Sequence, residues 1–153
     1  MISRERDAIG PTYMAGAKKV FDYISSTQNS NYSWMRISLI SCFESESDTA
    51  TCDGVNKQFT LASGNSYATG SIPVQTQTTI NQEASRIPML AAGDMAVVLE
   101  TSVTYWPLFV SGDREWRLDG QTWTRQGLSA SLRFSNFVVT RPRGPRVVWS
   151  SSK

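Results

Sequence analysis

The sequence predicts an α+β fold in which an N-terminal amphipathic helix packs on a mostly antiparallel sheet of four or more strands. Apolar residues recur at helical spacing over 13–26, later segments alternate apolar and polar residues, and no regular strand–helix alternation indicates a parallel sheet. The chain has 153 residues, of which 40% are hydrophobic, and this is the size of one domain. We therefore expect a charged segment at 1–12, a single domain at 13–146 and a C-terminal tail at 147–153.

The predicted helix follows Gly10-Pro11-Thr12, where Thr12 or a neighbour would cap the helix and Pro11 fits the first turn. Over 13–26, apolar residues recur every three or four positions and form one stripe, which would lie on the sheet. The residues of this stripe are Tyr13, Ala17, Val20, Phe21 and Ile24. The polar residues Lys18, Lys19, Asp22 and Ser25 lie mostly elsewhere around the helix.

The first strand is predicted at Trp34–Cys42, with Met35 and Ile37 on one face and Arg36 on the other. The polar stretch from 43 to 92 follows, and a stretch of this kind is usually an exposed functional loop or a mobile one. Within this stretch the pattern favours two short elements. They are a strand at 57–62 and a helix around 80–90, ended or kinked near Pro88.

The longest clean alternation covers residues 97–106 and is closed by Pro107, so we expect it to form the central strand. Leu99 and Val103 fall on the face predicted to point inward, and Glu100 falls on the other face. Replacing Leu99 or Val103 by Ala is therefore expected to destabilise the fold far more than replacing Glu100.

Two further strand signals lie toward the C-terminus. An Asp-Gly pair between residues 116–118 and 122–124 predicts a β-hairpin. Residues 128–135 then alternate, Asn136 breaks the phase in the manner of a bulge, and residues 137–140 continue the strand. The residues predicted to point inward are Leu128, Ala130, Leu132 and Phe134.

The two cysteines, Cys42 and Cys52, enclose nine residues. They cannot make a tetrahedral metal site alone, and the chain has no His to complete one, so we expect no metal. The choice is between a disulfide and two free thiols. Cys42 ends an apolar strand and Cys52 precedes the turn signal Asp53-Gly54, which favours a bridge and hence an oxidising compartment.

Charge is unevenly distributed, because residues 43–113 carry a net −6 and residues 114–153 a net +6 within a total of +2. Two regions of opposite charge suggest that subunits contact one another head to tail, or only that the two regions form different solvated faces of the molecule. No apolar run approaches the roughly 20 residues that span a bilayer, and nothing near Met1 resembles a secretory signal.

The sequence offers no catalytic constellation. No His can act as a general base, the carboxylates show no recognisable pairing, and Gly-rich phosphate loops are absent. The acidic residues could attract Ca²⁺, but they lack the regular spacing of a calcium loop and favour a solvated loop; they are Glu44, Glu46, Asp48 and Asp53. We therefore expect a protein without enzymatic activity, catalytic residues, metal or cofactor.

Aromatic and basic residues near the C-terminus suggest binding. Trp116 and Trp123 could stack on sugars, although aromatic residues in sheets more often fill cores and interfaces. Arg141 and Arg143 could approach phosphates, but no nucleic-acid-binding motif accompanies them, and we expect no nucleic-acid partner. These four residues are the candidates for contacts with a partner or a glycan.

Two segments, Gly93–Phe109 and Phe137–Arg143, carry a family resemblance. The first combines Gly-Asp, an alternating strand and Tyr-Trp-Pro-Leu-Phe, and the second ends in Arg-Pro-Arg. With the preceding helix and strand, this order resembles the periplasmic part of TadE/TadG-like minor pilins (pseudopilins) of tight-adherence (Tad) type IV pilus systems. The resemblance extends over Tyr13 to Arg143.

The resemblance implies a pilin-like α+β domain, periplasmic or extracellular, that acts in pilus assembly or at the pilus tip through contacts with other pilus subunits and assembly proteins. Family members begin with a hydrophobic anchor helix and a cleavage site, which this chain does not show, so membrane attachment would need an anchor absent here. Without an anchor we expect a monomer or a weak oligomer. The alternative function is an extracellular glycan-binding or adhesion module.

Overall fold

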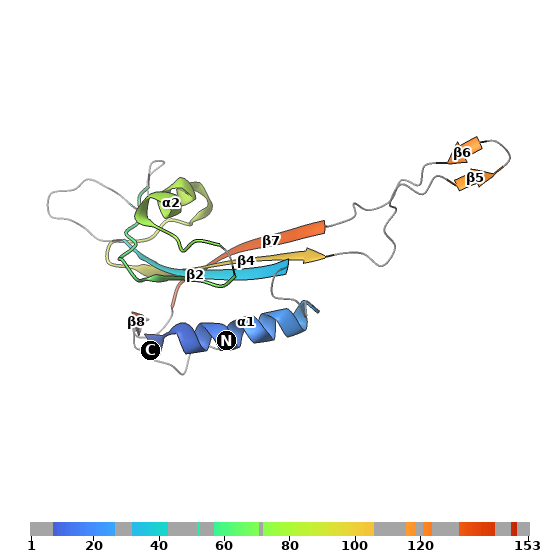
Figure 1. Cartoon of the computed structure of the whole chain (residues 1–153). Helices are drawn as coiled ribbons and strands as arrows, with labels where there is room; N and C mark the ends of the chain where they lie inside the picture. The colour runs from blue at the N-terminus through green and yellow to red at the C-terminus, as the bar shows by residue number, and fades with distance from the viewer. Residues whose placement is uncertain are drawn as a thin grey trace.

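The protein has an α+β fold built on a four-stranded antiparallel sheet with a helix near the N-terminus (Figure 1). The computed structural model describes residues 8–26, 32–42, 52, 57–70, 72–105, 116–118, 121–123, 132–142 and 148–149. The elements are β1 (Ala8–Ile9), α1 (Pro11–Ile24), β2 (Ser33–Ser41), β3 (Ser66–Ala68), α2 (Gln77–Gln82), the 3₁₀ helix η3 (Ala84–Arg86), β4 (Met95–Tyr105), β5 (Trp116–Leu118), β6 (Gln121–Trp123), β7 (Leu132–Thr140) and β8 (Val148–Trp149).

The strand order of the main sheet is β3-β2-β4-β7, and all of its pairings are antiparallel. The longest strand, β4, lies between β2 and β7, so the prediction of a central strand is confirmed. Gly93 precedes β4 at φ 78°, a left-handed conformation that glycine adopts without steric cost. In addition, β1 pairs with β8 in parallel and β5 pairs with β6.

The central strands β2 and β4 carry core residues on both faces of the sheet, which gives three layers (Figure 1). On one face, Ile37 of β2 packs with Leu99 of β4 and with residues of α1. On the other face, Ile40 of β2 and Val98 of β4 pack against the α2–η3 region, including Ile80. Because both faces are covered, the polar–apolar alternation of β4 does not separate core from solvent.

The prediction that Glu100 faces solvent is therefore wrong. Glu100 is buried, whereas Leu99 and Val103 are only partly buried. A second layer covers the face on which Glu100 lies, and Arg36 on the neighbouring strand supplies its counter-charge.

Helix α1 lies along one face of the sheet, and the predicted stripe is confirmed in part, because Tyr13, Ala17 and Phe21 pack on the core (Figure 1). Met14 and Lys18 are the buried residues of α1, whereas Val20 and Ile24 are exposed. The orientation of the helix places the Lys18 side chain against Ser33 of β2, and in this orientation Val20 and Ile24 face outward. The cap also differs, because Gly10 is the N-cap without a side-chain hydrogen bond and Pro11 starts the helix.

The polar middle of the chain was predicted least accurately. The expected strand at 57–62 is a single β-bridge between Thr60 and Ser41, and the third strand of the sheet lies instead at Ser66–Ala68. The helix begins earlier than expected, at Gln77, and is followed by η3. A capping box between Thr76 and Thr79 explains this earlier start.

The C-terminal hairpin is confirmed, since Leu118 pairs with Gln121 across residues that lie outside the described part. The predicted bulge at Asn136 is wrong, because Asn136 is the register partner of Thr101 in an unbroken ladder. Phe134 is exposed rather than inward, and Phe137 packs on the core instead. Leu128 and Ala130 lie outside the described residues.

Matched isoleucine substitutions test this assignment of core and surface. Ile80→Ala should lower the free energy of unfolding by about 2 to 5 kcal/mol, because Ile80 is 0% exposed and its loss leaves a cavity. Ile24→Ala should change it by less than about 0.5 kcal/mol, because Ile24 is 74% exposed. Urea titration of both variants measures the difference. Equal losses would contradict the orientation of α1.

Candidate functional site

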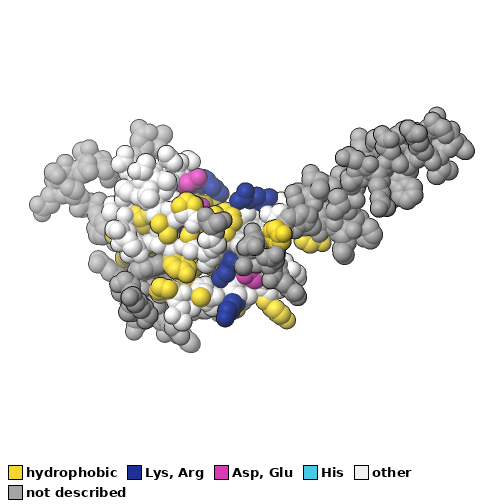
Figure 2. All heavy atoms as spheres, in the orientation of Figure 1, with side chains coloured by type: hydrophobic (Ala, Val, Ile, Leu, Met, Phe, Trp, Pro, Cys, Tyr) yellow, Lys and Arg dark blue, Asp and Glu magenta, His cyan; other side chains and the backbone are white. Residues whose placement is uncertain are grey.

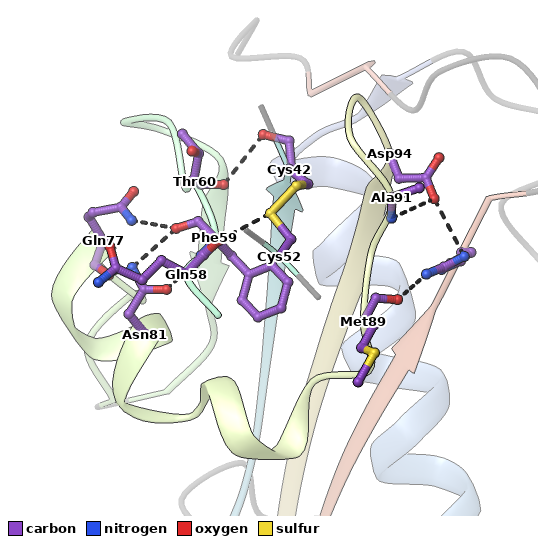
Figure 3. Close-up of a disulfide and its surroundings, with 12 residues drawn as sticks. Cys42, Cys52, Gln58, Phe59, Thr60, Gln77, Asn81, Met89, Ala91 and Asp94 are labelled. Atoms are coloured by element: carbon purple, nitrogen blue, oxygen red, sulfur yellow. Dashed lines mark hydrogen bonds and ion pairs between the residues drawn. A yellow bond between two sulfur atoms is a disulfide. The ribbon is translucent and has the colours of Figure 1, made fainter. Parts of the chain in front are cut away.

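A disulfide between Cys42 and Cys52 ties the end of β2 to the layer that contains α2 (Figure 3). The two Cα atoms lie 6.0 Å apart, and both cysteines are buried in the core beside Phe59. Their backbones hold the segment that leads into β4. Cys42 N–H donates to Asp94 O at 2.9 Å, and Leu90 N–H donates to Cys52 O at 3.2 Å. The predicted bridge is thus present, and it fixes the approach to the central strand.

Two amide side chains of α2 hold the backbone around Phe59 (Figure 3). Asn81 Oδ1 accepts from Phe59 N–H at 2.8 Å, and Asn81 Nδ2 donates to Phe59 O at 3.1 Å. Gln77 Oε1 accepts from Leu61 N–H at 2.7 Å. These bonds replace a strand partner for the segment after Cys52, because they satisfy backbone groups close to the core.

The first buried polar cluster joins α1 to β2 and consists of Lys18, Asp22 and Ser33. Lys18 Nζ lies 2.6 Å from both carboxylate oxygens of Asp22 and 2.8 Å from Ser33 Oγ. Ser33 Oγ in turn donates to Asp22 Oδ1 at 2.5 Å. The side chains satisfy one another, so the cluster fixes how α1 lies along β2.

The second buried cluster joins β2, β4 and the segment before α2. Arg36 Nε donates to Glu100 Oε2 at 2.6 Å and Arg36 Nη2 donates to Glu100 Oε1 at 2.8 Å, which makes a bidentate pair. Gln75 Nε2 adds a third donor to Glu100 Oε2 at 3.0 Å. The guanidinium also lies 5.9 Å from the centroid of the Trp34 ring. Arg36 and Glu100 are register partners, so the pair forms directly across the two strands.

The two clusters have a structural role. Within the described residues, no buried side-chain nitrogen or oxygen lacks a hydrogen-bond partner, and no group of His, Cys, Asp and Glu could hold a metal ion. Ser33 lies beside Lys18, as a nucleophile and a base would, but its hydroxyl is buried and is bonded to both charged partners. A substrate therefore has no approach to Ser33 Oγ.

The structure brings together two of the four residues predicted for binding. Trp116 and Trp123 are register partners in the β5–β6 hairpin. Arg141 donates to the carbonyl oxygen of Met89, and Arg141 Nη1 lies 3.4 Å from Asp94 Oδ2, so Arg141 holds the turn before β4. Arg143 lies outside the described residues.

Sequence reasoning missed the two polar clusters. The spacing of Lys18 and Asp22 at i and i+4 was a signal for an ion pair, although not for its burial. No local signal joins Arg36 to Glu100, because their proximity depends on the register between β2 and β4.

Apolar side chains reach the surface of the described part between charged and polar residues, and in two groups they recur along one element (Figure 2). The first is the outer side of α1, with Val20, Tyr23 and Ile24. The second is β7, with Phe134 and Val138. Exposed apolar groups that recur along one element are candidates for contact with another protein.

Comparisons with protein-family models, curated proteins and solved structures find no match to this chain. None of the helices in the described ranges is long and apolar enough to cross a membrane.

The disulfide should stabilise the fold by closing a loop. Replacing both cysteines, as Cys42→Ser with Cys52→Ser, should lower the free energy of unfolding by about 3 kcal/mol. The reason is that a bridge closing a loop of this size reduces the conformational entropy of the unfolded chain. Urea titration with and without a reducing agent measures this. Reduction should bring the unmodified protein to the value of the double variant and leave the variant unchanged. Ready reaction of both thiols with a maleimide in the unreduced, native protein would contradict the bridge.

Because Glu100 is buried, removing one partner of the Arg36–Glu100 pair should destabilise the fold more than replacing both partners. Glu100→Ala should lower the free energy of unfolding by about 3 to 5 kcal/mol, because it removes the counter-charge of Arg36 and the acceptor of Arg36 Nε, Arg36 Nη2 and Gln75 Nε2. Replacing both partners, as Arg36→Met with Glu100→Leu, should recover most of that loss.

The control for this pair is Glu83→Ala, which removes the exposed ion pair with Arg86 and should cost less than about 1 kcal/mol. Urea titration of the three variants gives the comparison. An Ala substitution at Glu100 that costs no more than the one at Glu83 would show that burial does not strengthen the inner pair.

Proposed function

We propose that this protein is a structural subunit that works outside the cytoplasm through contacts with other subunits, as a minor pilin of a Tad-type pilus does. The observation that carries the proposal is the two-sided helix α1. One side packs Met14 and Phe21 on the sheet, and the other side presents Tyr23 and Ile24 to solvent. A helix that is anchored by one face and apolar on the other offers a surface to a second protein.

The order of the elements supports the pilin-like form of this proposal. A helix lies along a four-stranded antiparallel sheet, and the Gly-Asp pair at 93–94 directly precedes the central strand, in the order that the family resemblance implies. Helix α1 starts at Pro11, because Gly10 is extended and Ala8–Ile9 form strand β1, so the expected continuation into an upstream stalk helix does not hold. In such a subunit, contacts with neighbouring subunits would come from the exposed side of α1 itself.

The disulfide supports a location outside the cytoplasm, because such bonds persist in oxidising compartments. The buried polar residues support a structural role, since Lys18 and Glu100 bond to partners on neighbouring elements of the same chain. Activity would then depend on the surface of the molecule rather than on a reaction centre.

The proposal is tested in the source organism with the protein tagged and expressed from its own gene. We expect the protein to copurify with pilus subunits, and Ile24→Lys to reduce that recovery about tenfold, because a charge on the exposed face of α1 disrupts an apolar contact. Ala15→Lys is the matched control, because Ala15 is exposed on the same helix outside the apolar group. Quantitative mass spectrometry of the purified complexes measures both.

Two outcomes would overturn the proposal. One is a protein found in the cytoplasm with both thiols reduced, and the other is equal recovery of pilus subunits with Ile24→Lys and the unmodified protein. A glycan array tests the alternative, which the pairing of Trp116 with Trp123 in one hairpin favours. Selective sugar binding that Trp116→Ala or Trp123→Ala abolishes would establish the glycan-binding module in place of the pilin.

A further inference from the structure

The two edges of the main sheet differ in how they are covered. Strand β3 pairs with only part of β2. The backbone of β2 on either side of β3 is hydrogen-bonded to neighbouring segments of the chain. Leu39 N–H donates to Asn65 O, Met35 N–H donates to Thr69 Oγ1, and Ser41 forms a bridge with Thr60. At the other edge, all nine residues of β7 pair with β4, and no described strand lies on the far side of β7.

The edge at β7 also carries exposed apolar side chains. Val138 is the register partner of Leu99, which packs beneath α1, so Phe134 and Val138 lie on the α1 face of the sheet. The cluster under α1 includes residues of β2, β3 and β4 but none of β7. Phe134 and Val138 are therefore exposed on the edge strand β7, which α1 does not cover.

Natural sheets protect long edges with prolines, bulges or inward charges, because an unpaired edge is a template for another strand. Within β7 there is no proline, and its ladder with β4 is unbroken. Arg133 is its charged residue, and the Arg133 side chain bonds to Ser102 on β4. The edge therefore has the features of a pairing surface.

We propose that β7 pairs antiparallel with β7 of a second copy of this chain, about a two-fold axis through Asn136. The sequence of β7 is self-complementary in this register, which engages all nine residues. Phe134 of each copy lies opposite Val138 of the other, so the exposed apolar side chains cover one another. Arg133 lies opposite Val139, so like charges do not meet.

Neighbouring registers lose this complementarity. A two-fold axis through Ser135 places Asn136 opposite Phe134, and an axis through Phe137 places Thr140 opposite Phe134. Neither register therefore covers Phe134 with an apolar side chain. The contact is one strand ladder with two apolar pairs, which is smaller than a standard protein interface, so the dimer should be weak and dependent on concentration. The pairing depends on the edge of the sheet and is independent of the proposed pilus function.

Analytical ultracentrifugation over a range of concentrations tests the dimer. We expect reversible dimerisation and an increase of about tenfold or more in the dissociation constant for Val138→Lys, which places a charge opposite Phe134 of the other copy. Val74→Lys is the matched control, because Val74 is 48% exposed, Val138 is 44% exposed, and Val74 lies outside the sheet. A monomer at all concentrations, or equal weakening by both variants, would overturn the proposal.

Crosslinking tests the register separately. The Asn136→Cys variant should form a disulfide-linked dimer under mild oxidation, because the two side chains lie opposite each other at the axis. The Thr140→Cys variant should not, because Thr140 is exposed on the same face but lies about 27 Å from its counterpart across the axis. Non-reducing gel electrophoresis separates the outcomes. Equal crosslinking of both variants, or crosslinking of Thr140→Cys alone, would overturn the register.

Discussion

The fold depends on the pairing of β4 with β2, because this pairing places a buried charge opposite its counter-charge. Glu100 lies in the middle of the central strand and is buried, and Arg36 meets it from the adjacent position on β2. A shift of β4 by one residue in this register would move Glu100 to the face that carries Met35 and Ile37 of β2, where burial of a lone carboxylate is costly. The ion pair therefore selects one register, and the apolar residues on the two faces stabilise it.

The disulfide and the amide side chains of α2 extend this constraint to the second layer. Cys42 ends β2, and Cys52 bonds through its backbone to Leu90 just before β4, so the bridge links both central strands to the α2–η3 region. Gln77 and Asn81 then hold the segment around Phe59 against that region. Segments with few apolar residues are thus kept in the core layer by a covalent bond and side-chain hydrogen bonds.

Local patterns predicted much of the fold. The strand expected at Trp34–Cys42 lies at Ser33–Ser41, and the central strand, the hairpin and the bridge were also foreseen, because each depends on neighbouring residues. The errors arose where burial is decided by distant segments. The burial of Glu100 requires Arg36 and the second layer, and β3 is a three-residue strand whose sequence carries no strong pattern. In the candidate site the bridge was foreseen, whereas the polar clusters depend on tertiary contacts.

The two exposed apolar surfaces can be used at the same time. A two-fold axis perpendicular to the sheet keeps each face of the combined sheet on its own side, so α1 of both copies would lie on the same side of an eight-stranded sheet. Pairing at β7 covers Phe134 and Val138 but leaves Tyr23 and Ile24, on the outer side of α1, accessible. A dimer formed through the sheet edge would thus present two copies of the helix surface in one direction. Two linked copies bind a repeating assembly more strongly than one, because the second contact forms at a high effective concentration.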